Sequence, residues 1–190
     1  MSTHDRKALF LDRDGVININ HGYVYQIQNV DFVDGIFDLI KRFVREDYVP
    51  VILTNQSGIA RGLYTERDFE AVMAYFQQAF QQHGIDSIPV FHCPHHPDFP
   101  DRNGVSECDC RKPKAGLFEQ AVRAHHFNVE NSVMIGDKVI DMIAAERAGV
   151  GRRVLFDVNG DQRHKLTTDE ALHQPQRVEV FEHLSAVNPR

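Results

Sequence analysis

Short hydrophobic runs alternate along the chain with longer segments in which hydrophobic residues recur at helical spacing. Each short run is bounded by polar or turn-forming residues, as is typical of buried strands. The predicted strands are residues 7–11, 49–53, 88–92, 132–136 and 152–156, with a last one at 178–181. Between and after them, spacing of three and four predicts helices at 35–46, 65–84, 114–126 and 140–149. In the clearest of these, Thr65 can cap the first turn, Asp68 stands at capping-box distance, and Gly84 can end the helix.

The alternation of strands and helices predicts an α/β fold with a mostly parallel central sheet and helices on both faces. We expect a single domain over residues 1–190, with no large cap domain inserted. In such sheets, ligands bind beyond the carboxyl ends of the strands. We therefore expect the residues that follow each strand to lie together at one site.

Composition narrows the class of protein. The 190 residues include 27 acidic and 21 basic side chains, and this acidic balance does not favour a nucleic-acid partner. The charged N-terminus resembles neither a signal peptide nor a membrane anchor, and no apolar run approaches the roughly 18 residues of a spanning helix. Three cysteines, close together and beside histidine, argue against a disulfide framework. We expect a cytoplasmic protein without a membrane partner.

Acidic residues follow two of the predicted strands. Asp12 and Asp14 come directly after the first strand, and Asp137 and Asp141 follow the strand at 132–136. Carboxylates this close repel one another unless a cation lies between them. Hard oxygen ligands suit Mg²⁺, which in turn suggests a phosphate substrate.

Phosphate-binding groups follow other strands. Arg111 and Lys112 supply positive charge, and the loop after the second strand offers polar donors at Thr54, Asn55, Gln56 and Ser57. Together these residues could neutralise a phosphoryl group in transfer, and a carboxylate could itself accept that group.

All three cysteines lie in one segment, CPHHPDFPDRNGVSECDC, at 93–110. Cys93, Cys108 and Cys110 with one histidine would form a closed tetrahedral zinc site, which is structural and not catalytic. His95, His96 and His92 are the candidates for the histidine ligand. A loop of this length without secondary structure needs such an anchor to be ordered.

Four motifs carry a resemblance to a known family: FLDRDGVI (10–17), ILTNQSG (52–58), CRKP (110–113) and MIGDKVID (134–141). They resemble the haloacid dehalogenase superfamily of phosphohydrolases, which implies that superfamily's Rossmann-like fold. The resemblance implies that Asp12 is the nucleophile and a magnesium ligand, and that Asp14 is the general acid and base, with its backbone carbonyl on the metal. It also implies that Thr54 and Lys112 hold phosphoryl oxygens and that Asp137 completes the magnesium site.

Further stretches, among them HGYV (21–24), TNQSGIARG (54–62), CPHHP (93–97) and CDCRKP (108–113), are similar to the D-glycero-D-manno-heptose 1,7-bisphosphate 7-phosphatases of bacterial heptose-nucleotide and lipopolysaccharide precursor synthesis. This similarity implies His95 as the zinc ligand and a small sugar phosphate as substrate. The implied substrate-binding residues are Asn20, His21, Gly22, Tyr23, Thr54, Asn55, Gln56, Ser57, Arg111, Lys112 and Lys138. Asn20 departs from the family, which usually has an acidic residue there.

Three other interpretations stay open. Histidinol-phosphate phosphatases are close relatives of this family and share the zinc loop. A receiver-type signalling domain also places aspartates, a threonine and a lysine at a sheet edge, although it has no Cys₃His loop and no acid two residues after the acceptor. A zinc-organised binding module without catalysis is the third. Nothing in the sequence requires more than a monomer.

Overall fold

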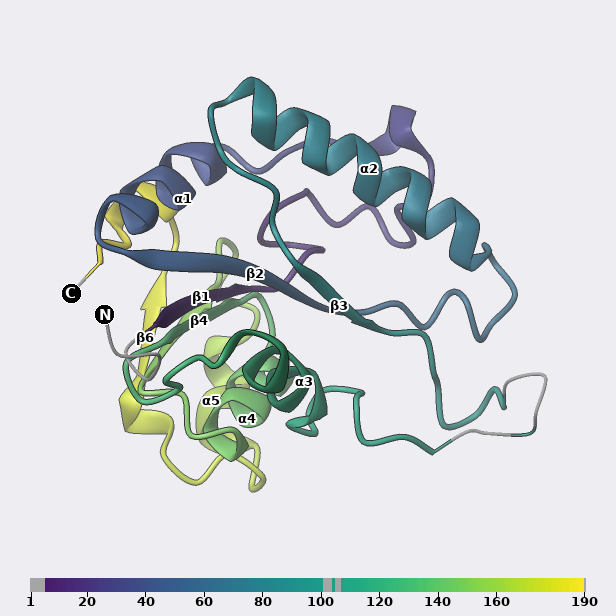
Figure 1. Ribbon diagram of the computed structural model, residues 1–190. Helices are drawn as coiled ribbons and strands as arrows, with labels where there is room; N and C mark the ends of the chain where they lie inside the picture. Colours follow the sequence, from purple (N-terminus) through teal and green to yellow (C-terminus); the bar gives the residue numbers. More distant parts are fainter. Residues whose placement is uncertain (1–5, 101–103, 105–106, 190) are drawn as a thin grey trace.

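Six parallel strands form the centre of the computed structural model, which describes residues 6–100, 104 and 107–189 (Figure 1). Their order across the sheet is β3-β2-β1-β4-β5-β6, and every neighbouring pair is parallel. The strands are β1 (Lys7–Leu11), β2 (Tyr48–Asn55), β3 (Val90–Cys93), β4 (Val133–Gly136), β5 (Arg152–Phe156) and β6 (Val178–Phe181). All six predicted strands are confirmed, the last of them included.

Helices cover both faces of the sheet, as predicted. In Figure 1, α1 (Ile36–Arg45) and α2 (Glu66–Gln82) lie above the sheet. Below it lie α3 (Gly116–His125), α4 (Val139–Arg147) and α5 (Arg163–Thr168). Three short 3-10 helices, η1 (Ile27–Asn29), η2 (Pro175–Arg177) and η3 (Leu184–Ala186), lie in connecting segments.

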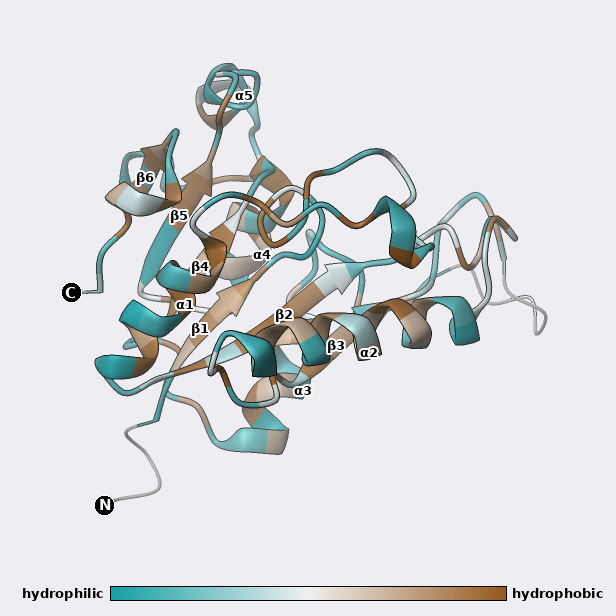
Figure 2. Ribbon diagram, turned by 90° about the horizontal axis from the view of Figure 1, so that it is seen from above, coloured by the Kyte–Doolittle hydropathy of each residue, from teal (hydrophilic) through white to brown (hydrophobic). Residues whose placement is uncertain are grey.

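Strand β1 is buried on both faces, which explains its unbroken hydrophobic sequence. Leu9 and Leu11 point into the core under α1 and α2, whereas Ala8 and Phe10 point into the core with α3 and α4. Successive strand side chains alternate between faces, so each face needs its own hydrophobic set. The hydropathy colouring of Figure 2 shows the brown central strands enclosed by helices whose outer positions are polar.

The short helix α5 was not predicted from the sequence. Its six residues, RHKLTT, contain one buried side chain, Leu166, so no hydrophobic periodicity marks it. Its start depends on a tertiary contact: the buried Asp157 carboxylate accepts hydrogen bonds from the backbone N–H groups of Gln162 and Arg163. Because that acceptor lies at the end of β5, the helix follows from the sheet and not from local propensity.

The connection from β1 to α1, residues 12–35, contains only η1 as regular structure, in agreement with the absence of a large cap at this point. Among the residues that the structure describes, no helix has both the length and the hydrophobicity needed to cross a membrane.

The capping box predicted for α2 is present. Thr65 Oγ1 accepts from the backbone N–H of Asp68 at 3.2 Å, and the Asp68 carboxylate accepts from the backbone N–H of Thr65 at 2.7 Å. We expect Thr65→Ala to lower the free energy of unfolding by about 1 kcal/mol, because one backbone donor of the helix loses its partner. Urea denaturation followed by circular dichroism measures this, with Thr65→Ser as the control that keeps the cap. Equal stabilities of the alanine and serine variants would contradict the prediction.

Candidate active site

The strand order brings the predicted site residues together. Strand β1 lies at the centre of the sheet between β2 and β4, so Asp12, Thr54 and Asp137 reach the same edge from three neighbouring strands. The backbone N–H of Asp12 donates to the carbonyl of Ile135 at 3.0 Å, which continues the β1–β4 pairing to the site. This is the position at which open parallel sheets bind ligands.

A cavity of about 130 Å³ lies at this edge. Its lining includes most of the predicted residues: Asp12, Asp14, Asn20, Gly22, Tyr23, Thr54, Asn55, Gln56, Ser57, Lys112 and Lys138. It also includes Arg13, Tyr64 and Ile140, which the sequence analysis did not single out, and Asp141. His21 and Arg111 are not among the residues that line it: His21 forms an exposed pair with Asp31, and Arg111 donates to the carbonyl of His95 at 3.2 Å.

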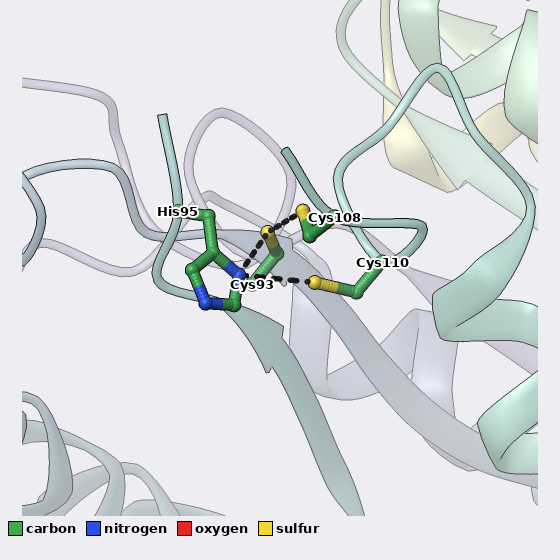
Figure 3. Close-up of side chains that lie close together, drawn as sticks. All are labelled: Cys93, His95, Cys108 and Cys110. Atoms are coloured by element: carbon green, nitrogen blue, oxygen red, sulfur yellow. Dashed lines mark hydrogen bonds between the residues drawn. The ribbon is translucent and has the colours of Figure 1, made fainter. Parts of the chain in front are cut away.

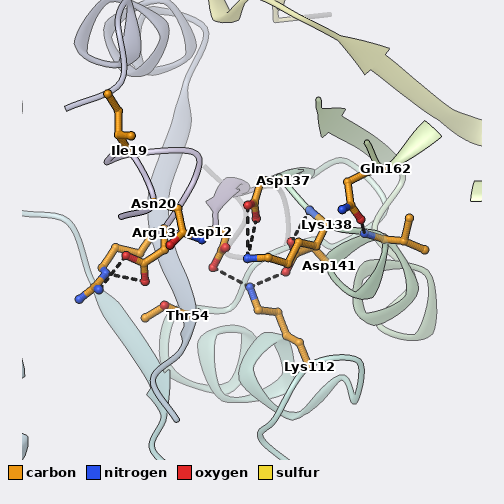
Figure 4. Close-up of polar contacts among 12 residues, drawn as sticks. Asp12, Arg13, Ile19, Asn20, Thr54, Lys112, Asp137, Lys138, Asp141 and Gln162 are labelled. Atoms are coloured by element: carbon orange, nitrogen blue, oxygen red, sulfur yellow. Dashed lines mark hydrogen bonds and ion pairs between the residues drawn. The ribbon is translucent and has the colours of Figure 1, made fainter. Parts of the chain in front are cut away.

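Lys112 is the buried cation of the site (Figure 4). Its ammonium lies 2.8 Å from Asp12 Oδ1 and 2.6 Å from Asp141 Oδ1, and it donates to the carbonyl of Leu53 at 2.8 Å. Burial lowers the pKa of Lys112, but the charges of Asp12 and Asp141 outweigh burial and raise it overall. Lys112 is therefore a permanent positive charge beside the Asp12 carboxylate.

Three carboxylates gather around this cation. Oxygen atoms of Asp12, Asp137 and Asp141 lie within 4.8 Å of one another. Burial, followed by the negative charges of Asp12 and Asp141, raises the pKa of Asp137 to about 8. Gly15 allows this approach, because a Cβ atom there would lie 2.2 Å from Asp137 Oδ2. The hard oxygen donors, and the repulsion that raises the pKa of Asp137, fit a bound Mg²⁺.

Asp141 has a further function in this arrangement. One of its oxygens pairs with Lys112, and the other accepts from the backbone N–H of Lys138 at 3.1 Å, at the start of α4. Gly136 accommodates it, since a Cβ atom there would lie 2.4 Å from the Asp141 Cβ. Asp141 thus orients Lys112 as well as adding negative charge.

Asp14 faces the other side of the cavity, where its carboxylate accepts four hydrogen bonds. Arg13 donates twice, from Nη2 to Oδ1 at 2.8 Å and from Nε to Oδ2 at 3.0 Å. Asn18 Nδ2 donates to Oδ1 at 3.1 Å and Gln56 Nε2 to Oδ2 at 3.0 Å. Arg13 is only 1% exposed although it lies inside the DRD motif, and no pattern in the sequence distinguishes it from a solvated arginine.

The second polar cluster lies in the loop after β3, where Cys93, His95, Cys108 and Cys110 converge (Figure 3). Cys93 Sγ lies 3.5 Å from Cys108 Sγ and 3.8 Å from His95 Nδ1, and Cys110 Sγ lies 3.5 Å from the same nitrogen. Around a tetrahedral zinc, ligand bond lengths imply S···S and S···N separations of about 3.8 and 3.6 Å. The cluster therefore fits zinc.

The other two candidate histidines have partners outside this cluster. His92 pairs with Glu66 on α2, and His96 Nε2 lies 2.8 Å from Arg61 Nη2. The hydrogen bond between Cys93 and Cys110 is the main cause that lowers the pKa of Cys110 to about 5, toward the thiolate, and it raises the pKa of Cys93. Of the three candidate histidines, His95 is therefore the one that lies in the cysteine cluster. Residues 101–103 and 105–106 of this loop lie outside the described residues.

Both ends of the cysteine-bearing loop are hydrogen-bonded to the end of β2 and the residue that follows it. The backbone N–H of Gln56 donates to the carbonyl of Cys93 at 2.7 Å. Asn55 exchanges two hydrogen bonds with the backbone of Lys112, at 3.0 and 3.1 Å. These hydrogen bonds fix the backbone of Lys112, two residues after Cys110, so that its side chain can reach Asp12.

Comparison with known proteins agrees with this geometry. The family model described as "HAD-hyrolase-like" matches residues 109–186. A D-glycero-beta-D-manno-heptose-1,7-bisphosphate 7-phosphatase of Vibrio cholerae is 43% identical over 150 residues, which are 79% of this chain and 81% of that protein. The chain belongs to the haloacid dehalogenase-like phosphatases. The protein of the same name from Escherichia coli K12 is 42% identical over 148 residues, 78% of each chain.

Solved structures of this family have the same fold. The D,D-heptose 1,7-bisphosphate phosphatase of B. bronchiseptica, complexed with magnesium and phosphate, matches with a TM-score of 0.79 and 31% identity, over 95% of this chain and 94% of that one. A putative HAD-like phosphatase of Mesorhizobium loti matches with a TM-score of 0.75 and 30% identity, over 80% and 72% of the two chains.

The raised pKa of Asp137 predicts a pH-dependent effect of Asp137→Asn. A carboxyl group whose pKa rises on folding destabilises the folded state as pH increases from its unfolded value of 3.8 to about 8. We therefore expect Asp137→Asn to stabilise the magnesium-free protein relative to wild type, increasingly from pH 5 to pH 8, and to abolish the stabilisation that magnesium adds. Thermal unfolding with and without Mg²⁺ measures both effects.

That experiment uses magnesium-free buffer without a chelator, so that the cysteine cluster keeps its metal. Asp38→Asn on α1 is the matched control, because Asp38 is exposed and lies outside the acidic cluster. A variant Asp137→Asn that is less stable than wild type at pH 8 without magnesium contradicts the prediction.

The cysteine-bearing loop, residues 93–110, generates a second prediction. We expect Cys110→Ser to lose most of its zinc, to give a lower yield of folded protein and to reduce kcat/KM, because Lys112 follows the lost ligand by two residues. Metal analysis and steady-state kinetics measure this. His96→Ala is the control, since His96 lies in the same loop but contacts Arg61 in place of the cluster. Normal kcat/KM in a zinc-free Cys110→Ser protein would show that the metal is not needed to position Lys112, and would contradict the prediction.

Proposed function

We propose that this protein hydrolyses the C7 phosphate of D-glycero-D-manno-heptose 1,7-bisphosphate, through an aspartyl-phosphate on Asp12. The observation that carries the proposal is the placement of Asp12: its carboxylate contacts the buried Lys112 cation, lies among the acidic cluster, and shares a cavity with Asp14. The names of the relatives in Vibrio cholerae and Escherichia coli support the choice of substrate.

In the first step, a carboxylate oxygen of Asp12 attacks phosphorus, and the bond between phosphorus and the C7 oxygen breaks. Lys112 neutralises negative charge on the phosphoryl oxygens, and the Thr54 hydroxyl donates a hydrogen bond to one of them. Asp14 gives its proton to the leaving alkoxide. An alkoxide is a poor leaving group, so this proton transfer contributes a large part of the rate.

In the second step, Asp14 accepts a proton from water, and the water oxygen attacks the phosphorus of the aspartyl-phosphate. The bond from phosphorus to Asp12 breaks, which releases inorganic phosphate and restores both carboxyl groups. The same residue thus serves as acid and then as base. Asp14 must exchange some of its four hydrogen bonds for contact with the substrate oxygen during this cycle.

The carboxylates of Asp12 and Asp137 and the backbone carbonyl of Asp14 would hold Mg²⁺. The ion supplies positive charge that stabilises the phosphoryl group in transfer. Cys93, His95, Cys108 and Cys110 would hold a structural zinc, whose closed ligand set leaves no position for water.

The heptose lies outside the small cavity in this proposal, against residues of the 18–29 loop. Tyr23 is 44% exposed beside the cavity, and the side chain of Asn20 accepts from the backbone N–H of Gly22 at 3.1 Å. Asn20 therefore shapes the turn in front of the site, whereas an acidic residue is usual there in the family. Single-domain architecture, a monomeric state and a cytoplasmic location stay predictions.

Phosphate release from three substrates tests the proposal. We expect a higher kcat/KM, with Mg²⁺ present, on heptose 1,7-bisphosphate of either anomer than on histidinol phosphate. A preference for histidinol phosphate would assign the protein to that relative. Asp12→Asn is expected to lower kcat by about 10⁴-fold or more, because the nucleophile is removed. Asp38→Asn is the surface control, and full activity of Asp12→Asn overturns the mechanism.

A further inference from the structure

Gln56 and Tyr64 form a buried chain of hydrogen bonds that ends on Asp14 and Thr54. Gln56 Nε2 donates to Asp14 Oδ2 at 3.0 Å and to Thr54 Oγ1 at 2.7 Å. Gln56 Oε1 accepts from the Tyr64 hydroxyl at 2.6 Å. Gln56 is 2% exposed and Tyr64 6%.

These contacts use both amide hydrogens of Gln56 inside the protein. A primary amide has two N–H donors and one carbonyl acceptor. Although the sequence suggests Gln56 as a substrate-binding residue, neither of its donors remains for a substrate. Its position between the proposed acid and the proposed phosphoryl contact is instead suited to orienting both of them.

Tyr64 determines which way the Gln56 amide faces. Burial is the main cause that raises the pKa of Tyr64 to about 12, so its hydroxyl keeps its proton at neutral pH. That proton is donated to Oε1, which leaves Nε2 facing Asp14 and Thr54. Without the hydroxyl, the amide could rotate and turn its oxygen toward the Asp14 carboxylate, where the two oxygens repel.

The ring of Tyr64 is itself held in place. A Cβ atom on Gly58 would lie 2.0 Å from a ring carbon of Tyr64, so this close approach requires glycine. The Tyr25 ring also stacks on Tyr64, with centroids 5.2 Å apart and an interplanar angle of 10°. Tyr25 belongs to the 18–29 loop, so the ring connects that loop with the segment after β2.

We propose that Tyr64 is a positioning residue for the reaction: through Gln56 it holds the Asp14 carboxyl and the Thr54 hydroxyl in the arrangement that proton transfer and phosphoryl binding require. Because Thr54 Oγ1 accepts from Gln56, its own hydrogen points elsewhere and can donate to a phosphoryl oxygen. This inference rests on the acid role given to Asp14 in the proposed function.

A comparison of leaving groups tests the inference. An alkyl phosphate needs a proton for its departing alkoxide, whereas para-nitrophenyl phosphate releases a stable phenolate that needs almost none. We expect Tyr64→Phe to lower kcat/KM about tenfold more on the alkyl phosphate than on para-nitrophenyl phosphate. The ratio kcat/KM excludes the hydrolysis of the aspartyl-phosphate, in which Asp14 acts alike for both substrates, and any loss through Thr54 is common to both. Equal losses on the two substrates would overturn the inference, since a purely structural defect lowers both alike.

A double-variant cycle tests whether Tyr64 acts through Gln56. Gln56→Met removes the amide at similar volume, and in its presence Tyr64→Phe is expected to change kcat on the alkyl phosphate by less than about twofold. Multiplicative losses in the double variant would show independent roles and contradict the relay. Tyr75→Phe on α2 is the matched control, because it removes a hydroxyl from a ring that stacks on Phe32 and does not line the cavity. Zinc content and thermal unfolding confirm that each variant is folded.

The alkyl arm uses heptose 1,7-bisphosphate, or any primary alkyl phosphate that the wild type hydrolyses. Failure of the wild type on the heptose substrate therefore rejects the proposed substrate and leaves the relay test intact. Conversely, normal heptose turnover with equal losses on both leaving groups rejects the relay alone.

Discussion

The buried ion pair between Lys112 and Asp12 is the interaction on which the site depends. An ammonium with no exposure to solvent is tolerated only where carboxylates surround it, and breaking such a pair leaves an uncompensated charge at a cost of about 3–5 kcal/mol. Asp12 lies at the end of β1, Asp141 at the start of α4, and Lys112 in the loop before α3. The pair therefore joins three parts of the chain that approach one another only in the folded sheet.

This constraint explains the position of the cysteine cluster. Lys112 must reach a buried carboxylate from a long connection between β3 and α3, whose described residues form no helix or strand to direct it. The cluster holds the connection at Cys93 and Cys110, and Asn55 and Gln56 attach its two ends to β2 and the loop that follows. Anchoring at both ends reduces the entropy that the loop loses when Lys112 is placed. The cysteine cluster and the candidate active site are thus parts of one arrangement.

The two aspartates of the DRD motif lie in different environments. Asp12 lies beside other carboxylates and a lysine, where charge is concentrated for phosphoryl transfer. Asp14, two residues later, points to the other side of the turn and is held by Arg13, Asn18 and Gln56. Gly15, with φ of 98°, turns the chain directly after Asp14. One short motif thereby provides two carboxylates with different surroundings.

Much of the fold and of the candidate site could be predicted from the sequence, because patterns among neighbouring residues specify the strands and helices. Short hydrophobic runs specify buried strands, and their alternation with helices leaves few topologies other than a parallel sheet. In such a sheet the residues after each strand meet at one edge, so the grouping of Asp12, Thr54, Lys112 and Asp137 follows. Close spacing of Cys93, Cys108 and Cys110 indicated their cluster in the same way, and the family resemblance implied His95 as its fourth member. The tertiary structure alone decided the rest, because contacts between residues far apart in the sequence leave no periodicity in it. These contacts are that of the buried Arg13 with the Val24 carbonyl, the pairing of Asp141 with Lys112, the orientation of Arg111 toward His95, and the path from Tyr64 through Gln56 to Asp14.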